Sequence, residues 1–222
     1  MNRVSVVKII GSIGLVISML LSGCTTSITD NNGSGNDLTA TEVIRLMGNG
    51  INLGNTLEAY NHKSYVDSGV NPTSFETLWG QPVTTRDMID DMKALGFDTL
   101  RIPVAWTNGI NYESGDYTID ERLMNRVDEV VNYALDADMY VILNDHWDGS
   151  WWGMFGSGDE AVREKGMALY KSIWTQLCEH FSDYSYKLIF ESANEELGDR
   201  LNDGEVTGLS LIHISEPTRP LY

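Results

Sequence analysis

One short segment places a carboxylate where acid chemistry could be performed. Residues 189–195 read Ile-Phe-Glu-Ser-Ala-Asn-Glu, an apolar run that ends in the pair Asn194-Glu195. The C-terminal end of a strand is where a (β/α)8 barrel carries its acids and bases. Glu195 is therefore a candidate acid/base, and the ordinary alternative is an exposed glutamate that simply follows a strand.

Three more polar side chains occupy equivalent places. Asn55, Arg101 and His146 each fall within or just after a short apolar run. The carboxyl ends of parallel strands share one face, so we expect these side chains to converge with the Asn-Glu pair. A doubly wound sheet would gather them similarly. However, no Gly-x-Gly-x-x-Gly follows the first apolar run, so dinucleotide binding has no support.

The neighbours of two of these residues narrow their roles. Arg101 stands between Leu100 and Ile102, so it should point away from them into the interior, where an arginine needs carboxylate partners. The alternative is a surface charge. His146 could contact a substrate, or it could be a core histidine bonded to backbone. Asp145 and Asp148 flank it, but no ligand set for a metal is evident, and supporting or surface roles are expected.

The elements that must position these residues alternate along the chain. Apolar runs alternate with helical periodicity, which predicts βαβ units and a parallel sheet. About four units are expected, half of an eightfold (β/α)8 barrel of the α/β class. The expected strands are 50–55, 97–104, 139–144 and 187–191, and the expected helices are 85–95, 119–135 and 159–181.

Composition excludes some classes of function. The chain has 222 residues, is 42% hydrophobic and carries a net charge of -17. The apolar content is enough for a packed core, and the acidity argues against nucleic acid as a partner. A complete barrel typically needs about 250 residues.

The N-terminus has a targeting pattern. Arg3 and Lys8 precede an apolar run, and residues 21–24 read Leu-Ser-Gly-Cys, which resembles a bacterial lipobox. We expect residues 1–23 to be a lipoprotein signal peptide and Cys24 to carry lipid that anchors the protein at the bacterial cell surface or outer membrane. An ordinary secretory signal is the alternative. Residues 24–40 are polar and indicate a flexible tether, and Cys178 then stands alone, as a core residue.

Four ordered motifs within residues 41–208 resemble glycoside hydrolase family 5, the cellulase-like retaining barrel glycosidases. They are residues 50–56 (Gly-Ile-Asn-Leu-Gly-Asn-Thr), 98–104 (Asp-Thr-Leu-Arg-Ile-Pro-Val), 144–149 (Asn-Asp-His-Trp-Asp-Gly) and 190–195. The resemblance implies that Glu195 is the acid/base, Asn194 holds the sugar, Arg101 supports the nucleophile and His146 lines the subsite at the cleaved bond. Glu196 departs from the family pattern, in which proline is usual.

The resemblance implies retaining hydrolysis of internal β-1,4 linkages in a plant-type polysaccharide, as in an endo-β-1,4-glucanase, without a cofactor or a metal. That mechanism needs a second carboxylate roughly 5–5.5 Å from the first. In the family it comes from the seventh strand, and this chain has no equivalent, so we expect the chain as written to be an inactive fragment. A non-catalytic surface glycan-binding lipoprotein, a defective fragment without function, and mannanase or xyloglucanase specificity remain as alternatives.

Aromatic residues after the third strand suggest where a sugar would stack. Aromatic faces bury the apolar C–H surface of sugar rings. We expect at least one of Trp147, Trp151 and Trp152 to form such a platform, with loop packing as the alternative. Weaker candidates of the same kind are Trp79, His62 and Asn55.

The last residues do not resemble barrel sequence. Residues 209–222 read Leu-Ser-Leu-Ile-His-Ile-Ser-Glu-Pro-Thr-Arg-Pro-Leu-Tyr. The first eleven resemble a translated sequencing-library adapter. We therefore expect a non-native tail after Gly208, and a natural short C-terminus is the alternative.

Overall fold

The computed structural model describes residues 38–60, 71–146 and 148–194. Several sequence-based predictions lie outside these ranges. They concern the signal peptide 1–23 with the lipidated Cys24, nearly all of the tether 24–40, His62, Trp147, Glu195 and the tail 209–222.

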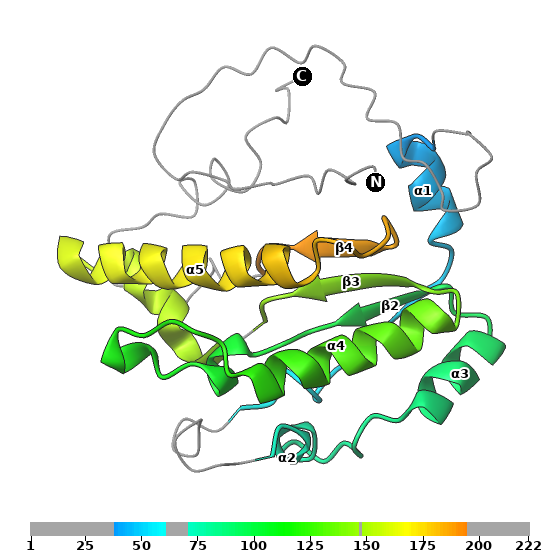
Figure 1. Cartoon of the computed structure of the whole chain (residues 1–222), viewed down its shortest axis with the longest axis horizontal. Helices are drawn as coiled ribbons and strands as arrows, with labels where there is room; N and C mark the ends of the chain where they lie inside the picture. Colours follow the sequence, from blue (N-terminus) through cyan, green and yellow to red (C-terminus); the bar gives the residue numbers. More distant parts are fainter. Residues whose placement is uncertain (1–37, 61–70, 147, 195–222) are drawn as a thin grey trace.

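Helices and strands alternate along the described chain (Figure 1). The strands are β1 (Gly50–Asn52), β2 (Thr99–Ile102), β3 (Tyr140–Asn144) and β4 (Leu188–Glu191). The α-helices are α1 (Ala40–Leu46), α2 (Thr73–Glu76), α3 (Arg86–Ala94), α4 (Glu121–Asp136) and α5 (Glu160–His180). Short 3-10 turns are η2 (Trp106–Gly109), η3 (Tyr112–Ser114) and η4 (Asp148–Gly156).

The strands form one parallel sheet in the order β1-β2-β3-β4. Leu100 of β2 pairs with Val141 of β3, which pairs with Leu188 of β4. The arrows of β2, β3 and β4 point the same way, to the left in Figure 1, and α1 lies at the opposite end. The predicted α/β fold with a four-stranded parallel sheet and helices between successive strands is therefore confirmed, and the carboxyl ends of all these strands share one edge.

Helix positions follow from caps and apolar stripes in the sequence. The Asp120 side chain accepts a hydrogen bond from the Arg122 backbone N–H at 2.8 Å and so begins α4. The Thr85 side chain caps α3 in the same way, and Gly96 ends it with a left-handed φ of 95°. The predicted stripe of α4 is buried: Leu123, Val127, Val130, Val131 and Ala134.

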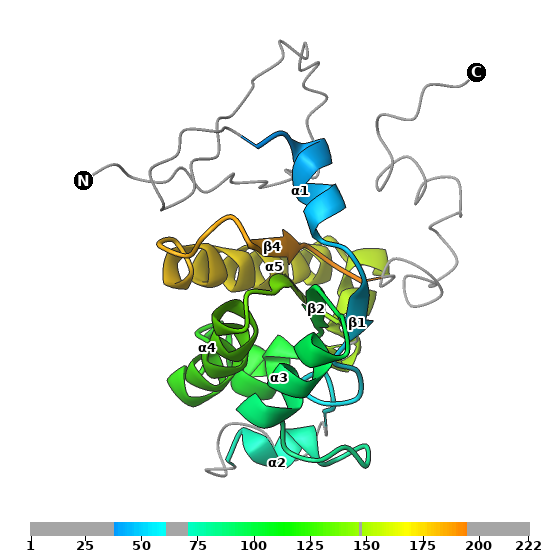
Figure 2. The ribbon, with the colours of Figure 1, turned by 90° about the vertical axis from the view of Figure 1, so that its right-hand side faces the viewer.

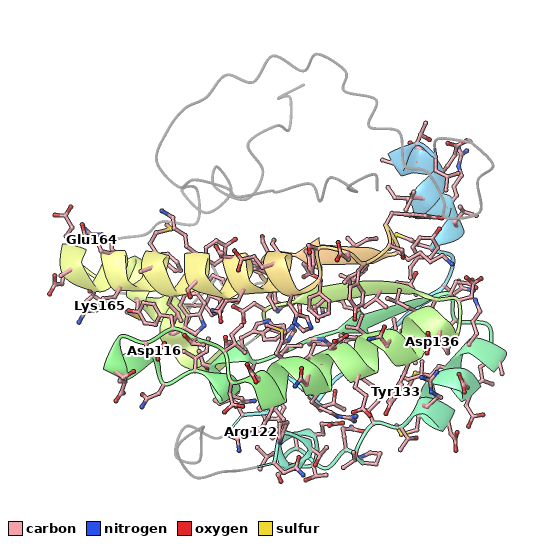
Figure 3. The ribbon with its side chains drawn as sticks, in the orientation of Figure 1. Asp116, Arg122, Tyr133, Asp136, Glu164 and Lys165 are labelled. Atoms are coloured by element: carbon pink, nitrogen blue, oxygen red, sulfur yellow. The ribbon has the colours of Figure 1, made fainter. Side chains whose placement is uncertain are left out.

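The core lies between the sheet and its helices. Leu100 and Ile102 of β2 are fully buried against that layer, whereas Arg101 between them faces the other side and is only partly buried. Figure 2 shows α3 and α4 side by side on one side of β1 and β2. The outer surfaces of α4 and α5 carry exposed charges such as Asp136 and Glu164 (Figure 3). Within the described ranges, the helices are too short or too polar to cross a membrane.

Candidate active site

Arg101 joins several strands at the carboxyl edge of the sheet. Its Nε donates to Glu191 Oε2 and its Nη2 to Glu191 Oε1, both at 2.8 Å. Its Nη1 also donates to Asn52 Oδ1 at 2.9 Å, and its Nη2 to Asn194 Oδ1 at 2.8 Å. The guanidinium therefore has the carboxylate partner that its flanking residues predict, and the partner is Glu191.

Glu191 was not singled out from the sequence. It closes an apolar strand opposite Asn144, and a charged residue at that place is the signal that could have found it. Burial raises the pKa of Glu191, but the hydrogen bonds and charge of Arg101 outweigh burial, so the pKa lies below its ordinary value. Glu191 is therefore an anion at neutral pH that holds Arg101, and it is unsuited to donate a proton.

Asn194 is fixed by two contacts from different strands. Its Oδ1 accepts from Arg101, and its backbone N–H donates to the Asp145 carbonyl after β3 at 3.1 Å. The Arg101 bond identifies the amide oxygen, so the Nδ2 group is the one that remains as a donor toward a ligand. Glu195 follows directly in the chain and lies outside the described residues.

The turn after β3 is built around a buried carboxylate. Asp148 is 0% exposed and accepts hydrogen bonds from Thr107 N at 2.7 Å and Trp151 Nε1 at 3.0 Å. Its φ of 23° is in the left-handed region, and burial raises its pKa above the ordinary value. Asp145 is also 0% exposed, so a surface role is wrong for both aspartates. Asp148 instead holds the loop that follows His146.

Trp151 and Trp152 do not offer a face to a sugar. Each is 2% exposed, and their rings stack on one another with centroids 4.2 Å apart. Trp152 also meets Tyr170 of α5 edge-on, because η4 packs against that helix. The expectation of a sugar platform is therefore not met by these two residues, and loop packing describes them. Trp147 lies outside the described residues.

An open hollow of about 430 Å³ lies at the carboxyl ends of the strands. Trp79 on its wall is 41% exposed, and its ring meets that of Tyr60 edge-on at 5.6 Å. Its lining residues are Asn55, Glu58, Tyr60, Trp79 and His146. Asn55 and His146 are thus brought together as predicted, and the exposed aromatic ring is Trp79, which was only a weaker candidate.

Glu58 shapes the wall of this hollow. It is 4% exposed, and its carboxylate accepts hydrogen bonds from the backbone N–H groups of Asn55 and Thr56. The bonds close the turn after β1, in which Asn55 adopts a left-handed φ of 61°. Burial raises the pKa of Glu58 despite these bonds and the charge of Arg101. The sequence signal that was missed is a carboxylate three residues after a turn asparagine.

The hollow and the Arg101 cluster influence one another electrostatically. The positive charge of Arg101 lowers the pKa of Glu58, and His146 lowers that of Glu191. The two sets therefore form one polar region at the strand ends. Across the described parts of the chain, no group of three or more His, Cys, Asp or Glu side chains is arranged to hold a metal ion.

Parallel β/α units with polar side chains gathered at the strand ends are the arrangement that β/α barrels and doubly wound sheets share. Residues 63–208 match the family described as "Cellulase (glycosyl hydrolase family 5)", and the chain belongs to this family. The expected (β/α)8 fold class is thereby confirmed, and the described residues supply four of its strands and the helices between them.

Relatives and solved structures agree with that membership. Endoglucanase B of Clostridium cellulovorans is 42% identical over 159 residues, which are 72% of this chain and 32% of that protein. A broad specificity endoglucanase from Ruminococcus champanellensis with bound cellotriose has a TM-score of 0.62 and 42% identity, over 72% of this chain and 44% of that one.

A family 5 enzyme from Prevotella bryantii, in complex with a xyloglucan tetradecasaccharide, has a TM-score of 0.61 and 35% identity. That match covers 71% of this chain and 44% of the other. The chain therefore spans only 32% of the length of the relative from Clostridium cellulovorans.

Proposed function

We propose that this chain carries the acid/base half of a retaining glycoside hydrolase that cleaves internal β-1,4 linkages of a plant-type polysaccharide. The observation that carries the proposal is the fixation of Asn194 by Arg101 and by the Asp145 carbonyl. Because Glu195 is the next residue in the sequence, the fixed position of Asn194 supports an acid/base role for Glu195 at the carboxyl edge of the sheet, where barrel enzymes hold their acids and bases.

In this mechanism Glu195 protonates the leaving glycosidic oxygen and later removes a proton from the attacking water. A second carboxylate, roughly 5–5.5 Å away, attacks the anomeric carbon. We place that carboxylate in the part of the family fold that this chain does not span, because the relatives are much longer. Arg101 and Glu191 act by holding Asn194 and the strand ends in place.

The sugar chain would lie in the hollow beside Trp79. Its exposed ring can cover the apolar face of a pyranose, while Asn55 and His146 supply polar groups at the same hollow. The related structures with cellotriose and with a xyloglucan oligosaccharide support a β-glucan as the ligand class. Within that class we favour cellulose-type β-1,4-glucan, and xyloglucan or mannan is the alternative.

A second candidate is a non-catalytic surface protein that binds glycan. The observation that favours it is that the hollow and the exposed Trp79 ring, which could bind a sugar without any hydrolysis, lie within the described residues. Both candidates predict binding of cello-oligosaccharide. Hydrolysis by a longer reading frame distinguishes them.

The deciding experiment compares this chain with a reading frame recovered from the source DNA across the codon for Gly208. Reducing-sugar release is measured on β-glucan, xyloglucan and mannan. We expect turnover only from a frame that supplies a second strand-end glutamate. In that frame Glu195→Gln should lower turnover by about 10²–10⁴-fold, and the neighbouring Glu196→Gln is the matched control. Equal losses in both variants, or turnover by the present chain, would contradict the proposal.

We also propose that the mature protein is lipid-anchored through Cys24 at the cell surface. The support is the spacing of Arg3 and Lys8, the apolar run after them and the Leu-Ser-Gly-Cys segment. An enzyme held there would meet a polysaccharide too large to enter the cell.

A further inference from the structure

A buried ion pair connects α2 to α4. Glu76, the last residue of α2, is 0% exposed, and Arg126 of α4 is 8% exposed. Arg126 Nε donates to Glu76 Oε1 at 2.8 Å, and its Nη2 donates to Glu76 Oε2 at 3.1 Å. Removing two charges from water costs free energy, which hydrogen bonds within the pair must offset. Apolar side chains could join the two helices at a lower cost.

The Glu76–Arg126 pair also holds a second point on the chain. Thr84 N donates to Glu76 Oε2 at 2.7 Å, and Arg126 Nη2 donates to the Thr84 carbonyl at 2.6 Å. Residues 77–83, here called the Trp79 loop, therefore leave the pair at Glu76 and return to it at Thr84. The guanidinium of Arg126 presents several donors in a rigid fork and so fixes both points at once.

The Trp79 loop gains little from packing of its own. Leu78, Trp79 and Val83 are 43%, 41% and 37% exposed. Backbone bonds from Leu78 N to the Phe75 carbonyl and from Gly80 N to the Thr77 carbonyl shape its first half. An edge contact with Tyr60 orients the indole ring at the hollow. The hydrogen bonds at Thr84 therefore keep the loop in one position, although its apolar side chains are exposed to water.

We propose that the Glu76–Arg126 pair is a positioning device for sugar binding: it closes the Trp79 loop and so holds the Trp79 ring against the hollow. The pair does not touch the hollow and acts through Trp79. This inference rests on the proposed function in so far as Trp79 meets sugar. Its structural half, that the pair sets the position of the ring, is independent of any ligand.

The test observes Trp79 directly in the complete 222-residue chain. The protein is labelled with 5-fluorotryptophan, and the fluorine resonance of Trp79 is assigned with Trp79→Phe. The variants are Arg126→Met and the double variant Glu76→Leu/Arg126→Met. The single variant leaves Glu76 buried without a partner and could unfold for that reason. The double variant replaces both charges with apolar side chains, so we expect it to keep the fold. The resonances of the buried Trp151 and Trp152 report on the fold.

The matched control is Glu129→Gln. Arg126 Nη1 also contacts Glu129 Oε2, at 2.5 Å, but that carboxylate side chain is 51% exposed and has no part in closing the loop. We expect the Trp79 resonance to move to the position of a mobile, solvated indole in the folded Arg126 variants and to stay in place in Glu129→Gln. An unchanged Trp79 resonance in the folded double variant, or equal shifts in the control, would overturn the inference.

Cellotriose then separates the two proposals. A Trp79 shift on its addition to the unaltered chain supports the sugar site, and we expect the dissociation constant to rise about tenfold when the pair is removed. If cellotriose leaves Trp79 unchanged in the unaltered chain, the sugar site is wrong, whereas the free-state resonances still decide whether the pair positions the ring. Unaltered affinity in a variant whose Trp79 resonance has moved would overturn the role in sugar binding.

Discussion

Arg101 and Glu191 form two parallel hydrogen bonds of 2.8 Å that join β2 to β4 past the intervening strand β3. The same guanidinium contacts Asn52 on β1, so one side chain connects three strands at the carboxyl edge. It also fixes Asn194. The position of the residue before the proposed acid/base therefore depends on an ion pair inside the sheet edge.

Removing this pair should lower stability moderately. The two side chains are 23% and 33% exposed, so the pair is partly screened by water. We expect Glu191→Gln to lower the free energy of unfolding by about 1–3 kcal/mol, because Arg101 loses charged hydrogen bonds. Urea denaturation measures this, with the exposed Glu164→Gln on α5 as the control. Equal effects of the two substitutions would show that the pair does not stabilise the fold.

The stabilisation by Glu191 should depend on pH. Its folded pKa lies below the ordinary value of 4.5, so its contribution is complete above that value and is lost as the pH falls through the folded pKa. The difference in unfolding free energy between the unaltered protein and Glu191→Gln should therefore be largest near neutral pH and narrow below 4.5. A constant difference down to about pH 3 would contradict the lowered pKa.

Glu58 should show the opposite dependence. Its folded pKa is raised above 4.5 by burial, so its contribution is complete below that value and is lost as the pH rises through the folded pKa. The difference in unfolding free energy between the unaltered protein and Glu58→Gln should fall with rising pH. Urea titrations at several pH values measure it, and a difference that grows with pH would show that the pKa of Glu58 is lowered instead.

The turn after β3 should be sensitive to the chemistry of Asp148. The two carboxylate oxygens of Asp148 accept hydrogen bonds from Thr107 N and Trp151 Nε1. In Asp148→Asn one oxygen becomes an N–H₂ group, which faces one of these donors and cannot accept its hydrogen bond. We expect a loss of about 1–3 kcal/mol in unfolding free energy. The exposed Asp91→Asn on α3 should change it by less than about 0.5 kcal/mol. If Asp148→Asn leaves the free energy of unfolding unchanged, the buried carboxylate does not hold the loop.

The N-terminal pattern leads to a separate prediction. If Cys24 carries lipid, Cys24→Ala should release the protein from the membrane fraction of a bacterial host and abolish incorporation of labelled fatty acid. Detergent phase partitioning gives the distribution, and Cys178→Ala is the matched control. Release of the unaltered protein from the membrane fraction, without labelled fatty acid, would identify the segment as an ordinary secretory signal.

Much of the fold could be predicted because it depends on local periodicity. The apolar runs and the stripe from Leu123 to Ala134 located the four strands and α3, α4 and α5 to within a few residues, whereas the short helices α1 and α2 were not predicted. Alternation in β2 also indicated that Arg101 faces away from Leu100 and Ile102. Such patterns follow from backbone geometry within one element, which neighbouring residues alone specify.

Other features required the tertiary structure. The partner of Arg101 is Glu191, 90 residues away, and it is decided by how β2 and β4 lie across β3. Trp151 and Trp152 are buried because η4 packs on α5, whereas Trp79 lies at the hollow because its loop closes on Arg126.

The sequence by itself determined the alternation of the four strands with the three longer helices, the parallel sheet and the edge at which the polar residues gather. Only the tertiary structure decided which aromatic ring is open to a ligand and which carboxylate meets Arg101. The physical reason is that burial and ion pairing are set by surfaces from distant segments, and a residue's type does not reveal which surface will cover it.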